Sequence, residues 1–326
     1  MYTDPLFSII IPTRNRRASL LDCVQAICLL EYPANRFEVI IVDDGGEPPL
    51  ESVASIDRRR INLVFLRQDP RGPAAARNTG AAHARGRYLV FTDDDCRPDS
   101  HWLQRIEASL PGTEDCLIAG SAHNVFRYNT YSAATQTLVD YMNLYYNVDT
   151  ANGRFLTSNN IAVPRDHFLE IGGFDITFQF AAGEDRDFCE RWRQHGLQVL
   201  YRPDCVVDHA HCLNFSSYFR QHFNYGRGAY HFRYLSARRS SSHIRFEPLS
   251  FYCRLIIHPW SAAVPIRSAK LLALMVISQV ANVAGYVYQS VLDPPATAQD
   301  ITASLGHLPS EVVSDGNSHF RPVRRR

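Results

Sequence analysis

The stretch Tyr88-Leu-Val-Phe-Thr-Asp93-Asp94-Asp95-Cys-Arg-Pro98 decides the fold of this chain. Its first residues favour a buried strand, and Pro98 ends the segment soon afterwards. Three consecutive carboxylates at the end of a strand repel one another unless a positive charge lies among them. Carboxylate oxygens are ligands that suit Mg²⁺ or Mn²⁺. A solvated acidic turn is the simpler alternative, because aspartate is common in turns.

Apolar strands and helices alternate along the chain on either side of this stretch. Strands are predicted over Phe7–Pro12, Phe37–Val42 and Ile61–Leu66, and helices over Ser19–Leu30 and Pro73–Arg85. This alternation predicts an α/β fold with a mostly parallel central sheet flanked by helices. Ligands bind outside the carboxyl ends of such strands, where Arg14, Asp43, Asp44 and the Asp93–Asp95 run fall. No G-x-G-x-x-G follows a strand, which disfavours a dinucleotide dehydrogenase.

Composition narrows the classes of protein further. The formal net charge of +1 gives no global basic field, so no nucleic-acid partner is expected. Lys270 is the single lysine, which excludes a Gly-Lys-Ser/Thr phosphate loop. The 8 cysteines form no C-x-x-C pair and are expected to be reduced thiols of a cytosolic protein. The N-terminus lacks a basic region before a long apolar stretch, so no signal peptide is expected.

Four segments resemble the successive signatures of family 2 glycosyltransferases, which are inverting enzymes with the GT-A fold. They are Ser8–Asn15, Val39–Gly45, Gly72–Asn78 and Phe91–Asp95, and the resemblance runs from about residue 6 to about residue 230. It implies a nucleotide-sugar donor, usually UDP-linked. It also implies a metal ligand in Asp95 and a donor site made of the following residues: Pro12, Arg14, Asp43, Asp44, Arg77, Asp93 and Asp94. Asp44 beside Gly45 fits an ordinary turn equally well.

The segment Gly183–Gly196 predicts a helix that begins with two acids, Glu184 and Asp185. Acids at this place complement the helix macrodipole by roughly 0.3–1 kcal/mol each, which is explanation enough for an arbitrary helix. The pair also resembles the Glu-Asp motif of the family, which implies that Asp185 is the catalytic base and that Glu184 positions the acceptor. The dipole and nearby arginines are expected to keep Asp185 ionised.

Several further residues are assigned by the resemblance. His209 and His211 alternate along a predicted strand and share a face; the resemblance favours His209 as a metal ligand, and a surface role is the alternative. Residues that the resemblance places near the donor sugar, the diphosphate or the acceptor are Asn160, Gly173, Asp175 and Arg227. The Gln-x-x-Arg-Trp motif of processive relatives is absent near Arg227, which favours transfer of one sugar at a time. The predicted helix Tyr131–Tyr146 receives no chemical role.

Near the C-terminus, Leu271–Leu292 contains no charged residue and is long enough to span a bilayer. Its polar residues nevertheless fall within about a third of the helical wheel. They are Ser278, Gln279, Asn282, Tyr286, Gln289 and Ser290. A helix packed on the domain or lying in the membrane interface is therefore preferred over a spanning one.

These observations predict a GT-A domain over residues 1–230, with a nucleotide-binding half over about 1–110 and an acceptor-binding half over about 111–230. A helical, membrane-associated segment follows over 231–293, and a disordered tail over 294–326. The predicted activity is inverting sugar transfer that depends on Mg²⁺ or Mn²⁺. The predicted acceptor is a glycan or a lipid-linked molecule, and the predicted location is the cytoplasm, at the cytoplasmic face of a membrane. The predicted setting is lipid-linked glycan or exopolysaccharide biosynthesis. Two alternatives stay open: a nucleotidyltransferase, which releases pyrophosphate, and a non-catalytic nucleotide-sugar-binding protein, which does not depend on Asp185.

Overall fold

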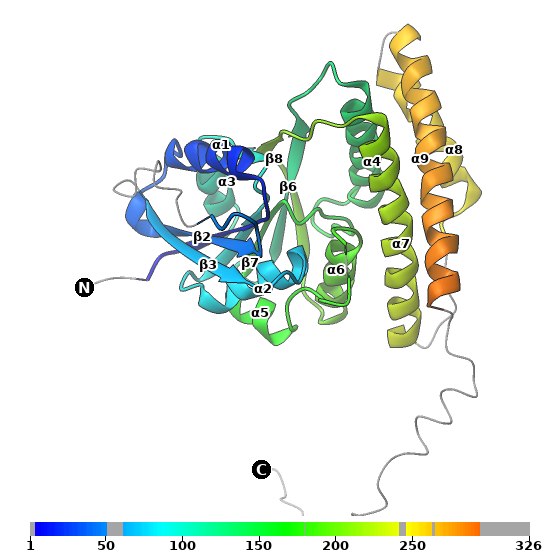
Figure 1. Cartoon of the computed structure of the whole chain (residues 1–326). Helices are drawn as coiled ribbons and strands as arrows, with labels where there is room; N and C mark the ends of the chain where they lie inside the picture. Colours follow the sequence, from blue (N-terminus) through cyan, green and yellow to red (C-terminus); the bar gives the residue numbers. More distant parts are fainter. Residues whose placement is uncertain (1–3, 51–60, 179, 241–245, 263–264, 294–326) are drawn as a thin grey trace, which may run out of the picture.

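The computed structural model describes residues 4–50, 61–178, 180–240, 246–262 and 265–293 (Figure 1). The predicted tail over 294–326 lies outside these residues. All eight cysteines are free thiols, as expected.

One sheet of eight strands forms the centre of the described chain, in the order β3-β2-β1-β4-β7-β6-β8-β5. The strands are β1 (Phe7–Thr13), β2 (Phe37–Asp44), β3 (Asn62–Gln68), β4 (Tyr88–Thr92), β5 (Cys96–Pro98), β6 (Leu117–Asn124), β7 (Asn160–Pro164) and β8 (Val199–His209). Strands β1 to β4 are parallel, as predicted. Strand β7 is antiparallel to both its neighbours, and β5 is antiparallel to β8. The α/β class is confirmed, and the sheet as a whole is mixed.

Helices cover both faces of the sheet, which explains the continuous apolar runs of the first strands. Ile9 and Ile11 point to the face covered by α1 (Arg17–Cys28) and α3 (Trp102–Ala108), whereas Ile10 points to the opposite face. That second face is covered by α2 (Pro73–His83), α5 (Arg165–Glu170) and α6 (Glu184–Gln194), as Figure 1 shows. Because successive side chains of a strand point to opposite faces, each residue of β1 must be apolar or hydrogen-bonded.

The remaining helices lie beside the sheet on one side of the molecule (Figure 1). They are α4 (Thr130–Tyr146), α7 (Phe215–Ser240), α8 (Leu249–Ala262) and α9 (Pro265–Leu292), and a short 3₁₀ helix, η1 (Ala34–Arg36), precedes β2. Helix α7 continues through residue 230, the predicted domain boundary. The Tyr218 hydroxyl donates to the carbonyl of Leu274 at 2.8 Å, and that of Tyr230 donates to the carbonyl of Asp293, so α7 and α9 run in the same direction.

Two glycines bring the backbones of α7 and α9 into direct contact. A Cβ on Gly226 would lie 1.9 Å from the carbonyl oxygen of Asn282, and one on Gly285 would lie 1.9 Å from that of Phe223. A real Cβ atom does not come this close to a backbone oxygen. Any larger residue at either position therefore forces the two helices apart.

Helix α9 turns its polar side inward and its apolar side outward. The predicted polar stripe lies toward the protein: Ser278 is buried, and Gln289 accepts a hydrogen bond from Arg227 of α7 at 2.7 Å. The outer side carries large side chains that are 44–73% exposed, and they are Val276, Val280, Val283, Val287, Tyr288, Val291 and Leu292. At 100° per residue the exposed arc covers roughly 180° of the helix. Helix α9 thus packs on the rest of the protein through its polar side, and the choice between a spanning and a non-spanning helix stays a prediction.

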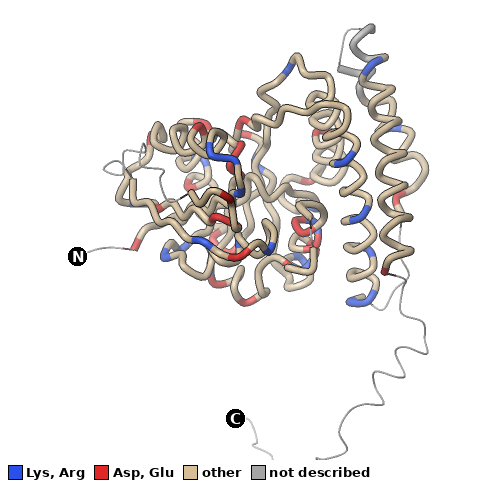
Figure 2. Tube along the Cα trace, viewed as in Figure 1, with Lys and Arg blue, Asp and Glu red and all other residues tan. Residues whose placement is uncertain are grey.

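By length and composition, Ala269–Leu292 is the one described helix that could cross a membrane, and 33% of it is buried inside the protein. Figure 2 shows the absence of charge along α9 between its two ends.

Candidate active site

A cavity of about 650 Å³ opens beside the carboxyl ends of the strands. Its lining brings together the end of β4, the start of α6 and the end of β8. The titratable residues that line it there are Arg16, Arg77, Asp93, Asp95, Glu184, Asp185, His209 and His211. Of the residues predicted to converge at the ends of parallel strands, Asp93 and Asp95 are in the described lining of this cavity, and Arg14, Asp43, Asp44 and Asp94 are not.

Asp94, the middle acid of the run, points into the protein. It is buried, and its carboxylate accepts a hydrogen bond from the hydroxyl of Thr13 at 2.7 Å and pairs with Arg16 at 2.8 Å. Burial raises the pKa of Asp94 to about 7, although Arg16 and Thr13 oppose the rise. Asp94 is not among the described residues that line the cavity. Its role as a donor contact stays a prediction.

Arg16 was not assigned from the sequence, which drew attention to Arg14 instead. The guanidinium of Arg16 bridges two acids, Asp94 at 2.8 Å and Asp95 at 2.6 Å. Its side chain is 46% exposed and lines the cavity. Arg14 is exposed and lies outside the described lining. Arg16 therefore neutralises two acids of the run, Asp94 and Asp95.

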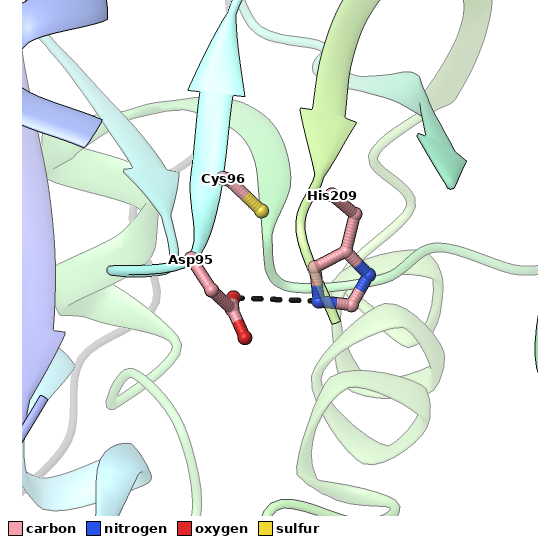
Figure 3. A group of neighbouring side chains, drawn as sticks. All are labelled: Asp95, Cys96 and His209. Atoms are coloured by element: carbon pink, nitrogen blue, oxygen red, sulfur yellow. Dashed lines mark ion pairs between the residues drawn. The ribbon is translucent and has the colours of Figure 1, made fainter. Parts of the chain in front are cut away.

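Asp95 and His209 face each other across the cavity wall (Figure 3), with His209 Nε2 3.3 Å from Asp95 Oδ1. Burial raises the pKa of Asp95, but the hydrogen bond and charge of His209, together with Arg16, outweigh burial and hold this pKa well below its usual range. Burial lowers the pKa of His209, but Asp95 outweighs it and the pKa is raised. Burial and the neighbouring His209 lower the pKa of His211 to about 4. Of the two histidines, His209 is the partner of Asp95.

Asp95, Cys96 and His209 each offer a ligand atom within 4.8 Å of the other two (Figure 3). Cys96 belongs to the apolar core, and burial raises the pKa of its thiol well above the usual value. A protonated thiol is a poor ligand, whereas a carboxylate oxygen suits Mn²⁺ or Mg²⁺ and a neutral imidazole is a common metal ligand. The donor set that fits a divalent cation is therefore Asp95 with His209.

Arg77 of α2 is 2% exposed and joins two parts of the site. Its guanidinium pairs with Asp93 at 2.7 Å and with Glu184 at 3.2 Å. Burial, and then the charge of Asp185, raise the pKa of the buried Glu184 carboxyl to about 7, against the opposing effect of Arg77. Arg77 thus holds the end of β4 against the start of α6. The predicted contacts of Arg77 with the nucleoside and of Glu184 with the acceptor stay predictions.

Asp185 is half-buried in the first turn of α6, after Gly183, whose φ of 94° sets the turn into the helix. Its Oδ1 accepts the backbone amide of Arg186 at 2.7 Å. Burial raises the pKa of Asp185, and the Arg186 amide and Arg77 oppose this without cancelling it. Burial therefore outweighs these two effects in the direction of the shift, and the expectation that Asp185 is ionised stays a prediction. A raised pKa makes the carboxylate a stronger proton acceptor.

Helix α6 is fixed from behind by the last turn of α7. The carboxylate of Asp187 is fully buried and pairs with Arg191 at 2.7 Å and with Arg239 at 2.7 Å. Arg239 also pairs with Glu190 at 3.2 Å. A buried carboxylate held by two guanidiniums fixes its helix firmly, so the orientation of Asp185 depends on α7.

The acids at the end of β2 stabilise their own loops. Asp43 accepts the amide of Gly46 at 2.8 Å, and Asp44 accepts that of Gly72 at 2.9 Å. Pro12 is buried within β1. None of these three predicted donor residues is among the described residues that line the cavity. Their contacts with a nucleoside stay predictions.

Asn160 does not reach the cavity. It is 2% exposed; its Oδ1 accepts the indole N–H of Trp102 at 2.9 Å, and its amide donates to the carbonyls of Ser121 and Cys205. The residue that lines the cavity is its neighbour Asn159. The two neighbours face different sides because consecutive residues at the start of a strand point in opposite directions. The predicted contact of Asn160 with the sugar or the acceptor stays a prediction.

The last three residues assigned by the resemblance make their hydrogen bonds outside the described cavity lining. The carbonyl of Gly173 accepts a hydrogen bond from Arg191 at 2.7 Å, Asp175 accepts one from Thr177 at 2.7 Å, and Arg227 donates to Gln289 of α9 at 2.7 Å. The described cavity lining contains none of the three. Their predicted places near the sugar or the acceptor stay predictions.

The model of the family described as "Glycosyl transferase family 2" matches residues 8–172. The chain belongs to glycosyl transferase family 2. Among curated relatives, "Glycosyltransferase AglE" of Haloferax volcanii is 27% identical over 69% of this chain and 73% of its own length. "Pre-mycofactocin glycosyltransferase" of Mycobacterium tuberculosis is 26% identical over 68% of this chain, which spans 46% of that relative.

Solved structures show the fold of this family 2 glycosyltransferase. A mannosyltransferase from Pyrobaculum calidifontis, solved with GDP-Man and Mn²⁺, has a TM-score of 0.57 at 18% identity over 86% of this chain and 87% of its own. A fragment of S. aureus TarS, solved with UDP-GlcNAc, has a TM-score of 0.52 at 15% identity over 95% of each chain. The predicted GT-A-like architecture is confirmed.

Proposed function

We propose that this family 2 glycosyltransferase transfers a sugar from a nucleotide-sugar donor to an acceptor hydroxyl with inversion at the anomeric carbon. One observation carries the proposal: a carboxylate with a raised pKa, Asp185, and a cation-binding pair, Asp95 and His209, line the same cavity. The glycosyltransferases with similar folds were solved with GDP-Man or UDP-GlcNAc, which supports a nucleotide-sugar donor. UDP-sugars are the first donors to test.

Asp185 acts as the base in this proposal. It accepts the proton of the acceptor hydroxyl while the hydroxyl oxygen forms a bond to the anomeric carbon and the bond to the nucleoside diphosphate breaks. A single displacement of this kind inverts the configuration. Arg77 keeps Glu184 and Asp93 in place beside the reacting groups. Arg16, exposed on its cavity side, is positioned to contact the diphosphate.

Asp95 and His209 would hold the divalent cation, Mg²⁺ or Mn²⁺. Such a cation, when bound, stabilises the negative charge that develops on a departing diphosphate. Mn²⁺ accompanies the donor in the similar mannosyltransferase.

We propose that the enzyme works in the cytoplasm, at the membrane surface. Its proposed acceptor is a lipid-linked glycan, and its proposed setting is lipid-linked glycan or exopolysaccharide biosynthesis. The outward apolar arc of α9 supports this placement, because large contiguous apolar surfaces mark contact sites. Twenty-two uncharged residues of helix measure about 33 Å. An arc of this length and width fits a continuous apolar medium better than one partner helix. Partitioning with liposomes, lost in Val280→Asp, tests the placement.

The donor site is tested by calorimetric titration of UDP and of GDP, with and without Mn²⁺. One nucleotide is expected to bind with Mn²⁺, at least tenfold more weakly in Asp95→Ala, and unchanged in Asp22→Ala, whose carboxylate lies in an exposed pair with Arg97. Binding of neither nucleotide to the wild type contradicts the proposed donor site. Tight binding that ignores both Mn²⁺ and the Asp95→Ala change contradicts the role of Asp95.

The base is tested by Asp185→Asn. The rate of nucleoside-diphosphate release with an accepted acceptor is expected to fall about 10²–10⁴-fold, with nucleotide affinity kept. Release of pyrophosphate instead of nucleoside diphosphate identifies a nucleotidyltransferase. Donor binding without any Asp185-dependent turnover identifies a binding protein.

A further inference from the structure

The cavity extends well beyond the charged residues of the transfer site. Its lining also includes apolar side chains of two helices: Leu138, Val139 and Met142 from α4, and Phe251, Tyr252 and Leu255 from α8. These helices come from segments more than a hundred residues apart, and the Tyr141 hydroxyl of α4 donates to the carbonyl of Phe251 at 2.9 Å. Helix α8 therefore completes a wall that α4 alone does not form.

The apolar wall is not simply the protein core. Phe251 and Leu255 of the wall belong to a buried cluster with Tyr141 and Met275, whereas Leu138 and Met142, which pack against that cluster, are only partly buried. Side chains that pack on the core on one side and face a cavity on the other leave apolar surface that a bound ligand can cover.

The cavity also has a polar zone, which includes Gln221 and Tyr225. Gln221 donates to the Tyr225 hydroxyl at 2.6 Å. Burial raises the pKa of the Tyr225 phenol to about 12, and the charges of Asp185, Glu184 and Asp93 add to that rise. Tyr225 and the proposed base thus line the same cavity.

Two buried acceptors in this polar zone are unsatisfied. Within the described residues, Gln221 Oε1 and Asn159 Oδ1 have no hydrogen-bond partner, and both side chains line the cavity. Leaving such a group unpaired costs about 1–3 kcal/mol. Both atoms need donors, and the hydroxyls of a sugar are donors of the right kind.

We propose that the space between α4 and α8 binds the hydrocarbon chain of the acceptor, while Gln221 and Asn159 receive hydroxyls of its sugar. The proposal rests on the proposed function, since it takes Asp185 as the base. The cavity lining thus combines an acidic, cation-binding part, a polar part and an apolar part. These three parts suit a diphosphate, a sugar hydroxyl and an alkyl chain. The outward apolar arc of α9 favours a lipid chain over a soluble aromatic group.

The test uses n-octyl β-D-glucoside below its critical micelle concentration, with methyl and phenyl β-D-glucoside as matched probes, in calorimetric titrations of the full chain. Octyl glucoside is expected to bind at least tenfold more tightly than methyl glucoside, because burying as few as two methylenes gives that ratio. Leu138→Gln and Val139→Trp, the first adding polarity and the second filling the space, are expected to reduce the ratio below threefold. Circular dichroism melting verifies that each variant is folded.

Leu144→Gln is the matched control, because Leu144 is on the same helix but 62% exposed. The ratio of its affinities for octyl and methyl glucoside is expected to equal that of the wild type. Equal affinities of octyl and methyl glucoside, or an octyl preference that survives both cavity variants, overturns the proposal. A preference lost in Val280→Gln instead places the chain on α9 and overturns it too. Phenyl binding as tight as octyl overturns the assignment of an alkyl chain. UDP titration on the same samples separates the two ideas: missing UDP binding contradicts the proposed function, and a missing octyl preference contradicts this inference alone.

Discussion

Replacing Arg77 by methionine removes the one cation between two carboxylates of the site. Arg77 is 2% exposed and Glu184 is 3% exposed, and their charged atoms are 3.2 Å apart. Removing one partner of a buried pair costs about 3–5 kcal/mol, because the other charge stays buried and unpaired. Arg77→Met is therefore expected to lower the free energy of unfolding by about 3–5 kcal/mol at pH 8.

The loss is expected to depend on pH in a definite direction. The pKa of Glu184 is about 7 in the folded protein, above its ordinary value of 4.5. Between pH 4.5 and 7 the folded state therefore binds more protons than the unfolded state, so lowering the pH relieves the cost of burying this carboxylate. Arg77 lowers the pKa of Glu184, so its removal raises that pKa further. At pH 5.5 Glu184 is neutral in the variant, and the loss is expected to be clearly smaller than at pH 8.

The assay is urea denaturation at pH 8 and pH 5.5, followed by circular dichroism. Arg36→Met is the control, since Arg36 is 42% exposed and its pair with Glu107 is a surface pair worth at most about 1 kcal/mol. The double variant Arg77→Met/Glu184→Met is expected to regain much of the lost stability. An Arg77→Met protein as stable as the wild type at pH 8, or destabilised equally at both pH values, refutes the reasoning.

Three further outcomes follow from other parts of the structure. Gly226→Ala is expected to lower the urea midpoint, because overpacking against α9 costs about 1–3 kcal/mol of stability. Ala284→Val, on the exposed side of α9, is the control and is expected to leave the midpoint unchanged. Equal midpoints for the two variants contradict the close helix contact. Burial lowers the pKa of His222 from 6.5 to about 4 in the folded protein. As the pH falls from 6.5 to 4, the unfolded state binds a proton at this histidine before the folded state does. The free energy of unfolding is therefore expected to fall by up to about 3 kcal/mol over this pH range. Urea titrations of His222→Gln are expected to lack that part of the acid loss, and unchanged acid curves disprove the assignment. Arg16→Ala is expected to weaken UDP binding about tenfold without affecting uridine, as a lost charged hydrogen bond to a diphosphate requires; equal effects on both ligands speak against that contact.

The strands and helices of the first half were predictable because their signal is local. A strand buried on both faces is apolar throughout, and Ile9, Ile10 and Ile11 show this within three residues. The acids at the strand ends were predictable for the same reason, since the direction of each strand fixes the edge at which its final residues lie.

The detailed choice among neighbouring residues was not predictable. Asn159 and Asn160 are adjacent and identical in type, and only the pleat of β7 decides that Asn160 points at Trp102 while Asn159 faces the cavity. Arg16 differs from Arg14 by its place beside the first turn of α1, which directs it at Asp94. The direction in which such a side chain points depends on tertiary contacts, and a local sequence pattern does not contain them.

The apolar wall between α4 and α8 was hidden for a related reason. Its two sides are far apart in the chain, and the pattern of Leu138 and Met142 along α4 is that of any helix packed on a core. The same ambiguity affected the pKa of Asp185, where burial by distant segments outweighs the local effect of the helix terminus.

Helix α7 contacts three working parts of the molecule along its length. Gln221 and Tyr225 lie in the cavity wall, Gly226 touches the backbone of α9, and Arg239 grips Asp187 on the helix that carries the base. Helix α7 therefore forms one continuous structural connection between the exposed surface of α9 and the helix that carries Asp185, the proposed base.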